Sequence, residues 1–230
     1  MEGKAVSTDV LDEFARTQWE TILYFMVGSE HTSVPRNTVL FLLQRAGLMQ
    51  RDNSSSKKLN ITSKGFQFLL QDVNSQLWAL LLQYLSMAEE RNMDLVEVLA
   101  FFFTVGGLEL GRAYETRGFS TTQLQTLEEL SDYGLVYRPN KSAKHFFPTR
   151  LAATLTSTAS PLLLTLNDQE EQGYLILETN YRVYAYTANL LRISVLNLFV
   201  SLKSRLPNLV IGQLTRDSVK SALKLSLIHI

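Results

Sequence analysis

Few residues of this chain have the types and spacing that catalysis or metal binding needs. The three histidines, His31, His145 and His229, have no second ligand candidate at metal spacing, and the 230 residues include no cysteine. Gly106-Gly107 is not followed by the lysine of a phosphate-binding loop. The acidic pair Glu89-Glu90 is typical of a solvated helix end. We therefore expect a protein that is not an enzyme and that has no metal, cofactor or small-molecule substrate.

Two loops carry clustered basic side chains of the kind that contact phosphate. Residues 51–64 hold four basic residues and one acid, and residues 138–150 hold four basic residues and no acid. Such clusters supply non-specific attraction to nucleic acid, although exposed hairpin loops are often lysine-rich without binding anything. The candidates for a weak DNA contact are Arg51, Lys57, Lys58, Arg138, Lys141 and Lys144.

A third candidate for binding is the segment 174–186, which reads as a β-hairpin with its turn at Thr179-Asn180. Alternation in its second strand places Val183 and Ala185, together with Tyr181, on one face. The opposite face then shows Arg182, Tyr184 and Tyr186, and tyrosine and arginine are enriched at interface hot spots. The alternative is that more of the protein's own chain covers this face.

Local patterns predict the elements that position these residues. Apolar spacing and capping residues such as Thr62, Asp94 and Ser120 predict helices over 11–27, 34–46, 65–70, 74–90, 94–105, 121–133 and 215–224. A further long helix, capped by Thr187, is predicted to carry an apolar stripe from Leu191 to Leu202. Strands are expected over 48–50, 59–61, 135–137, 145–147, 174–178, 181–186 and 209–211.

An internal repeat relates two of these sections at a constant offset of 87 residues. Gly47-Leu48 corresponds to Gly134-Leu135, and Thr62 corresponds to Thr149. Helix, glycine, strand, polar loop and strand in this order is how a winged helix ends, and a repeated unit indicates tandem small domains. The first copy lacks an opening helix, so we expect the natural chain to begin earlier. The predicted class is mainly α with small β-hairpins (α+β).

Composition favours a folded protein with protein partners. The chain is 46% hydrophobic, and its 22 Lys and Arg balance 22 Asp and Glu. A free-standing DNA-binding domain usually has a basic excess, which this chain lacks. The apolar runs Leu95–Val105 and Leu190–Leu202 are shorter than the roughly 20 residues of a membrane span, so we expect no membrane association.

Several stretches, in order, resemble one protein family. They are Ile61–Ser63, Gly65–Leu70, Met93–Glu97, Tyr133–Val136, Pro148–Ala152, Glu178–Thr187, Arg205–Val210 and Thr215–Val219. Together they resemble the fourth core subunit of the general transcription and DNA repair factor TFIIH, over nearly all of residues 10–224. The resemblance implies tandem winged-helix domains followed by a clutch module that grips the amino-terminal part of the XPB translocase. It also implies a nuclear, structural role, which is to anchor XPB among the TFIIH core subunits and raise its ATPase activity in transcription initiation and nucleotide excision repair.

The resemblance suggests five sections. They are a winged-helix-like domain (1–72), a second winged-helix domain (73–156), a linker (157–172), a partial clutch (173–224) and a tail (225–230) that matches one reading frame of a sequencing adaptor. The XPB contacts it implies are Glu178, Asn180, Tyr181, Arg182, Tyr184 and Tyr186. The runner-up interpretation is a stand-alone winged-helix DNA-binding regulator, and a third is an adaptor in another assembly.

Overall fold

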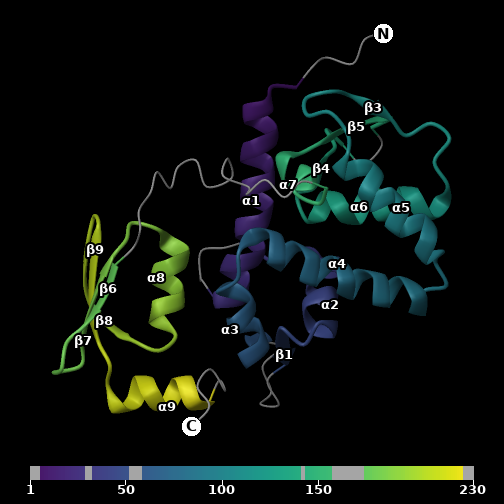
Figure 1. Cartoon of the computed structure of the whole chain (residues 1–230). Coiled ribbons are helices and arrows are strands. Elements are labelled where there is room, and N and C mark those ends of the chain that lie inside the picture. Colours follow the sequence, from purple (N-terminus) through teal and green to yellow (C-terminus); the bar gives the residue numbers. More distant parts are fainter. Residues whose placement is uncertain (1–5, 29–32, 52–58, 141–142, 157–173, 225–230) are drawn as a thin grey trace. The chain divides into compact units, whose positions relative to one another are not determined.

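The computed structural model describes residues 6–28, 33–51, 59–140, 143–156 and 174–224 (Figure 1). These residues form helices and small antiparallel sheets, which confirms the expected α+β class. The chain divides into two compact units that interleave along the sequence. The first comprises Met1–Ile22, Val34–Ala46 and Gln71–Asn167, and the second comprises Leu23–Ser33, Gly47–Leu70 and Asp168–Ile230. This division differs from the predicted section boundaries, which stay a prediction.

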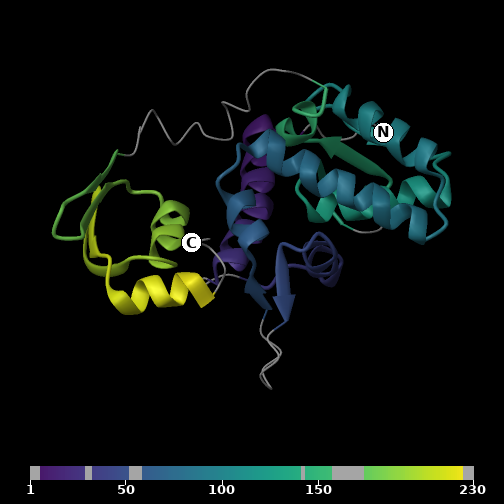
Figure 2. The same ribbon diagram turned by 60° about the horizontal axis from the view of Figure 1, so that its bottom comes forward.

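The first unit is a helical layer with one small sheet (Figures 1 and 2). Its helices are most of α1 (Thr8–Val27), α2 (Asn37–Arg45), α4 (Val73–Glu90), α5 (Leu95–Gly106), α6 (Thr121–Asp132) and the short α7 (Arg150–Ala153). The strands β3 (Tyr114–Glu115), β5 (His145–Pro148) and β4 (Val136–Tyr137) lie in that order and are antiparallel. The helices bury apolar stripes, so Leu42, Leu81, Phe102 and Leu127 are almost fully inaccessible to water.

Side-chain caps fix where several of these helices begin. Ser120 caps α6 as predicted: its hydroxyl accepts from the backbone N–H of Gln123, and the Gln123 side chain accepts from the Ser120 N–H, which together form a capping box. Asp94 accepts from the N–H groups of Val96 and Glu97, as expected. The Glu97 carboxylate, however, accepts the Ser120 hydroxyl at 2.6 Å and so ties α5 to the start of α6.

The internal repeat is present in the backbone itself. Strand β1 (Met49–Arg51) pairs with β2 (Leu59–Ile61) so that Met49 faces Ile61. In the second copy Val136 faces Pro148, which is the same register displaced by 87 residues. Gly47 and Gly134 have φ of 69° and 83°, the left-handed conformation expected for glycines that end helices.

A threonine closes each copy in the same way. The Thr62 hydroxyl donates to the backbone oxygens of Gly47 and Leu48, at 2.6 and 3.1 Å. The Thr149 hydroxyl donates to those of Gly134 and Leu135, at 2.7 and 3.0 Å. Glycine and threonine, 15 residues apart, therefore join the end of the hairpin to the turn at its start in both copies.

The second unit contains the β1–β2 hairpin with α3 (Ser63–Leu69) and a four-stranded antiparallel sheet. The sheet order is β6 (Tyr174–Leu177), β7 (Arg182–Tyr186), β9 (Leu209–Gln213) and β8 (Ser201–Leu206). Helix α8 (Leu190–Asn197) covers one face of this sheet, where Ile193 packs with Ala185 and Val210. Helix α9 (Arg216–Lys224) follows β9, and Thr215 and Ser218 exchange hydrogen bonds at its start.

The predicted long helix over 187–202 is wrong. Helix α8 is eight residues long and is capped by Asn189, whose side chain accepts from the N–H groups of Leu191 and Arg192. The chain leaves the helix through i→i−3 bonds at Leu198 and Phe199, and from Ser201 it pairs with β9. A leucine-rich run fits a buried strand as well as a buried helix, and here pairing with a distant strand decides.

The remaining differences are small. Strand β3 and helix α7 were not anticipated, because two and four residues give too short a periodic pattern to recognise. Within the described part of the chain, the structure has no helix of the length and hydropathy that crossing a membrane would require.

Candidate functional site

The sheet of the second unit has two unlike faces. Strand β7 alternates as predicted, since Val183 and Ala185 are buried while Arg182 and Tyr186 are exposed. Paired residues on neighbouring strands share a face, so Tyr174 joins Tyr186, and Ile176 joins Tyr184. The resulting outer face, opposite α8, carries Tyr174, Ile176, Arg182, Tyr184 and Tyr186. Tyr184 is only half-buried, which leaves part of its ring accessible.

The turn of the hairpin is built by its own polar side chains. The Asn180 oxygen accepts from the Arg182 N–H at 2.9 Å, and the Asn180 amide donates to the Glu178 carboxylate at 2.8 Å. Tyr181 has φ of 66°, a conformation that is unusual for a residue other than glycine. The turn therefore places Tyr181 outside the strand, where it is exposed instead of lying on the buried face with Val183.

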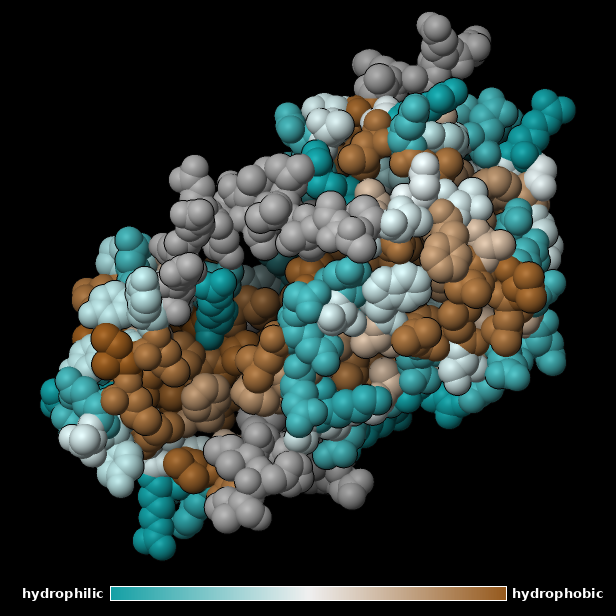
Figure 3. All heavy atoms as spheres, in the orientation of Figure 1, coloured by the Kyte–Doolittle hydropathy of each residue, from teal (hydrophilic) through white to brown (hydrophobic). Residues whose placement is uncertain are grey.

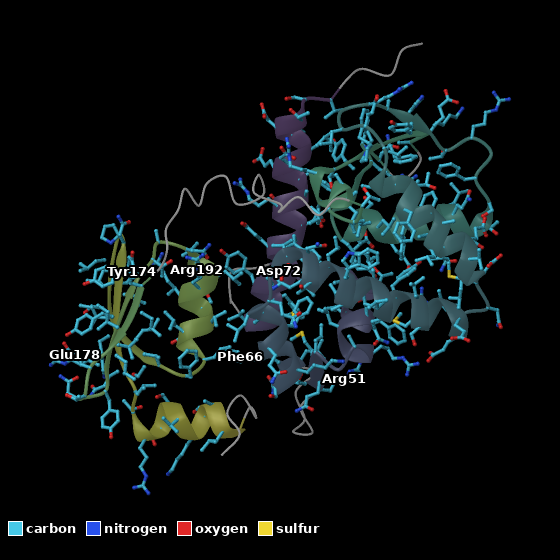
Figure 4. The ribbon with its side chains drawn as sticks, in the orientation of Figure 1. Arg51, Phe66, Asp72, Tyr174, Glu178 and Arg192 are labelled. Atoms are coloured by element: carbon cyan, nitrogen blue, oxygen red, sulfur yellow. The ribbon has the colours of Figure 1, made fainter. Side chains whose placement is uncertain are left out.

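The strand β6 was predicted, but the exposure of all its side chains at a sheet edge is the feature that sequence reasoning missed. The strand lies at one edge of the sheet, and all four of its side chains, Tyr174, Leu175, Ile176 and Leu177, are exposed. Figure 4 shows Tyr174 and Glu178 at the two ends of this edge. An exposed, apolar edge strand is a template for association with another chain, and soluble proteins usually protect such edges. A run of four large apolar residues without polar alternation was the signal that could have identified it.

The structure does not bring the basic loop residues into a single described cluster. Arg51 ends β1 and is exposed, and Lys144 is exposed directly before β5 begins. Arg138 is half-buried and reaches the backbone oxygen of Ala143 within its own loop. The candidates Lys57, Lys58 and Lys141 lie outside the described residues.

Helix α6, which precedes the second hairpin, is acidic. It carries Glu128, Glu129 and Asp132 and has no lysine or arginine. Glu129 is buried and accepts from Arg91 at 2.9 Å. Asp132 is buried and bound by Arg36 and Thr38. This helix therefore directs two of its three carboxylates into the protein and offers no basic side chain to a nucleic acid.

Tyr84 and Tyr133 lie in the packed interior next to helix α6. Burial raises the pKa of Tyr84 and of Tyr133, and the neighbouring Glu129 carboxylate acts in the same direction on both. Both phenols therefore stay neutral at physiological pH. Within the described ranges, no three His, Cys, Asp or Glu side chains gather in a way that could hold a metal ion.

Comparison with known proteins decides the family. A family model described as transcription factor Tfb2 matches residues 1–227. The chain belongs to the Tfb2 family. A relative from Yarrowia lipolytica, named general transcription and DNA repair factor IIH subunit TFB2, is 49% identical over 231 residues, which cover 95% of this chain and 49% of the relative. This confirms the resemblance seen in the sequence.

Two further relatives extend the match. The Saccharomyces cerevisiae subunit TFB2 is 41% identical over 97% of this chain and 51% of its own length. A Dictyostelium discoideum protein named general transcription factor IIH subunit 4 is 40% identical over 96% of this chain and 47% of its own length. The chain thus spans about half the length of the curated relatives that it matches.

Proposed function

We propose that this member of the Tfb2 family is a non-enzymatic part of TFIIH that acts in transcription initiation and nucleotide excision repair in the nucleus. The support is the family membership together with the names of relatives that match nearly the whole chain. Its partners are then other TFIIH core subunits, and XPB among them.

We propose further that residues 1–72 and 73–156 are tandem winged-helix domains. The support is the repeated unit of helix, left-handed glycine, strand, loop and returning strand, with identical register at an offset of 87 residues. In this assignment the two hairpin loops are the wings.

The most specific part of the proposal is that the four-stranded sheet anchors XPB and raises its ATPase activity. The observation that carries it is the exposed edge strand β6 beside the outer-face side chains Arg182, Tyr184 and Tyr186. Burial of such apolar side chains on a partner supplies affinity, and tyrosine and arginine anchors dominate interface energetics. The charged residues Glu178 and Arg182 at the turn lie where each would add specificity.

The test is capture of purified XPB by the 230-residue chain and by matched variants. Tyr174→Ala and Tyr186→Ala should each weaken capture by about 2 kcal/mol, or roughly 30-fold, and Ile176→Ser should act in the same direction. Leu206→Ser is the control, because Leu206 is 50% exposed on the opposite edge strand and Ile176 is 48% exposed. Equal loss in Ile176→Ser and Leu206→Ser would show that β6 is not the contact.

Arg182→Ala and Tyr184→Ala refine the test. We expect a smaller loss for Tyr184→Ala than for Tyr186→Ala, because less of the Tyr184 ring can reach a partner. Stimulation of the XPB ATPase should fall in proportion to capture across the series. Undiminished capture by all of these outer-face variants would place the interface elsewhere.

The alternative of a stand-alone DNA-binding regulator is less well supported. The helix before the second hairpin is acidic, and Arg45 of α2 is paired with Glu90. The exposed cations Arg51 and Lys144 then support only weak, non-specific duplex binding, in the range of about 10⁻⁴ to 10⁻⁶ M. A salt titration of duplex binding measures this directly, and nanomolar, sequence-selective affinity would overturn the scaffold proposal.

A further inference from the structure

Helix α5 of the first unit is apolar on its exposed side as well as on its buried side. Val98, Phe101, Phe102 and Val105 are buried, as the core requires, but Val96, Leu99 and Phe103 are exposed. A helix that is hydrophobic all round is normally covered all round. Figure 3 shows apolar side chains gathered over α4 and α5 on the face toward the viewer.

Helix α4 extends this apolar surface. Trp78 packs beside Phe103, with ring centroids 6.1 Å apart, and Leu82 lies one turn further along α4 and is exposed. On α5, positions 96, 99 and 103 follow the i, i+3, i+7 spacing of a single stripe. The contact of Trp78 with Phe103 joins the exposed side chain of Leu82 on α4 to those of Val96 and Leu99 on α5 in one apolar surface. We call these five residues the α4–α5 face.

A pocket lies on the other flank of α5. Its volume is about 290 Å³, and its apolar lining includes Phe101, Phe119 and Phe146. The ring of Phe119 lies 5.4 Å from that of Phe101 and 5.9 Å from that of Phe146. The carboxylates of Glu97 and Glu115 also line the pocket. It is large enough to receive one bulky side chain of a bound segment.

Residues 71–140 are acidic, with no lysine and four arginines against ten acids, although the whole chain is neutral. Four of these acids are already paired: Glu90 with Arg45, Glu109 with Arg112, and the buried Glu129 and Asp132 with Arg91 and Arg36. Glu89 and Asp94 are exposed at the connection between α4 and α5.

We propose that the α4–α5 face binds a basic amphipathic helix of a partner protein. Apolar side chains exposed on two neighbouring helices are complementary to the apolar i, i+3, i+4, i+7 face of such a helix, which is how helical segments dock on apolar surfaces of a partner. The exposed carboxylates of Glu89 and Asp94, at the connection between the two helices, favour lysine or arginine at the flank of the bound segment and disfavour an acidic segment. The face belongs to a different unit from the sheet proposed to bind XPB, so it is a second interaction surface.

The probe is an 18-residue helical peptide of leucine and lysine with all of its leucines on one face. Its matched controls are the same peptide with glutamate in place of lysine, and a lysine peptide of scrambled order. We expect the full 230-residue chain to bind the amphipathic lysine peptide at least about tenfold more tightly than either control, as measured by fluorescence anisotropy. Equal binding of the glutamate peptide, or no binding of the lysine peptide, would overturn the proposal.

Matched variants test whether the peptide binds at the α4–α5 face. Phe103→Ala should weaken binding about tenfold, or about 1.4 kcal/mol. Phe41→Ala is the control, because Phe41 on α2 is 49% exposed and Phe103 is 47% exposed. Val96→Lys should repel the lysine peptide with little risk to folding, because Val96 is the most exposed of the five residues. Similar loss in Phe41→Ala and Phe103→Ala, or unchanged binding by Val96→Lys, would refute the placement.

Other occupants give distinguishable results. If two copies of this chain cover the face, sedimentation will show self-association that Phe103→Ala abolishes. If the chain's own apolar residues Leu162–Leu164 cover it, changing them to serine will raise peptide affinity about tenfold. Either result would overturn the proposal. The experiment uses no XPB, so its outcome is independent of the proposed anchoring role.

Discussion

The two copies of the glycine–hairpin–threonine unit share a backbone and differ in what packs on it. In the first copy Gly47 is exposed, and a Cβ there would meet only the Lys64 side chain, at 4.0 Å. In the second copy Gly134 is buried, and a Cβ would lie 3.0 Å from the Ala15 backbone oxygen of α1. The same left-handed turn is therefore a surface feature in one copy and part of the core in the other.

The hairpins differ in the same way. Strand β5 of the second copy pairs with β3 as well as β4, and Phe146 and Phe147 are buried. The first copy has a two-stranded hairpin whose Gln50 and Arg51 are exposed. The comparison shows that the backbone conformation of the motif is determined locally. The free energy of unfolding that a substitution in the motif would cost is determined by the residues packed around it.

At one position the first copy is packed more tightly than the second, and a substitution there has the largest expected effect on stability. Gly65 in α3 corresponds to Ala152 in α7, and a Cβ at Gly65 would lie 2.2 Å from the Leu48 backbone oxygen. Gly65→Ala should therefore destabilise the protein by about 3 kcal/mol, since backbone must move, even after the higher helix propensity of alanine is counted. Urea unfolding measures the change. A cost below about 1 kcal/mol would mean that α3 can withdraw from β1.

The paired glycines provide the next test. Gly134→Ala should cost about 2 to 3 kcal/mol, because left-handed strain adds to the contact with Ala15 and Gln18. Gly47→Ala should cost about 1 kcal/mol, because only the backbone strain applies. Chemical denaturation of the two variants and of the unchanged protein measures both costs. Equal costs would contradict the distinction between a buried and an exposed turn.

The closing threonines should show a smaller difference. Thr149→Val leaves two carbonyl oxygens in the core without their hydroxyl donor, which should cost about 2 kcal/mol. Thr62→Val should cost about 1 kcal/mol, since water can replace the hydroxyl at this more open site, and part of that cost is the lost cap on Gly65. A larger loss for Thr62→Val would mean that capping outweighs burial.

The smallest expected effect concerns Asp72, which caps α4 and stabilises it more when its carboxylate is ionised than when it is neutral. The N–H and hydroxyl of Ser75 bind the Asp72 carboxylate at the start of α4 and hold its pKa below the usual 3.8. The stabilisation is therefore present above that pH and is lost as pH falls through the lowered pKa of the folded state. Asp72→Ala should lower the melting temperature at pH 7 by a few degrees and by less near pH 2. The deficit of Thr62→Val should stay constant, and a constant deficit for Asp72→Ala would contradict the assignment.

Much of the fold could be predicted because its signals are local. Gly47 and Gly134 end helices in a conformation that other residues avoid, and Ser120 with Gln123 encodes a reciprocal cap in four residues. The repeat indicated that the two hairpins correspond residue by residue, and the structure gives them the same register. On the candidate site, alternation in β7 correctly assigned Val183 and Ala185 to the buried face.

Tertiary structure decided what local patterns leave open. The run from Leu190 to Leu202 suits a helix or a strand, and only pairing of Ser201 and Leu202 with β9 makes its end a strand. Tyr181 does not follow the alternation of the strand, because its own backbone is in the left-handed conformation of the turn. The exposure of β6 and of the α4–α5 face follows from the position of each element at an edge or surface. The sequence by itself thus determined the repeated units and their turns, because those depend on neighbours along the chain. Which apolar residues face water was decided only by the packing of distant segments.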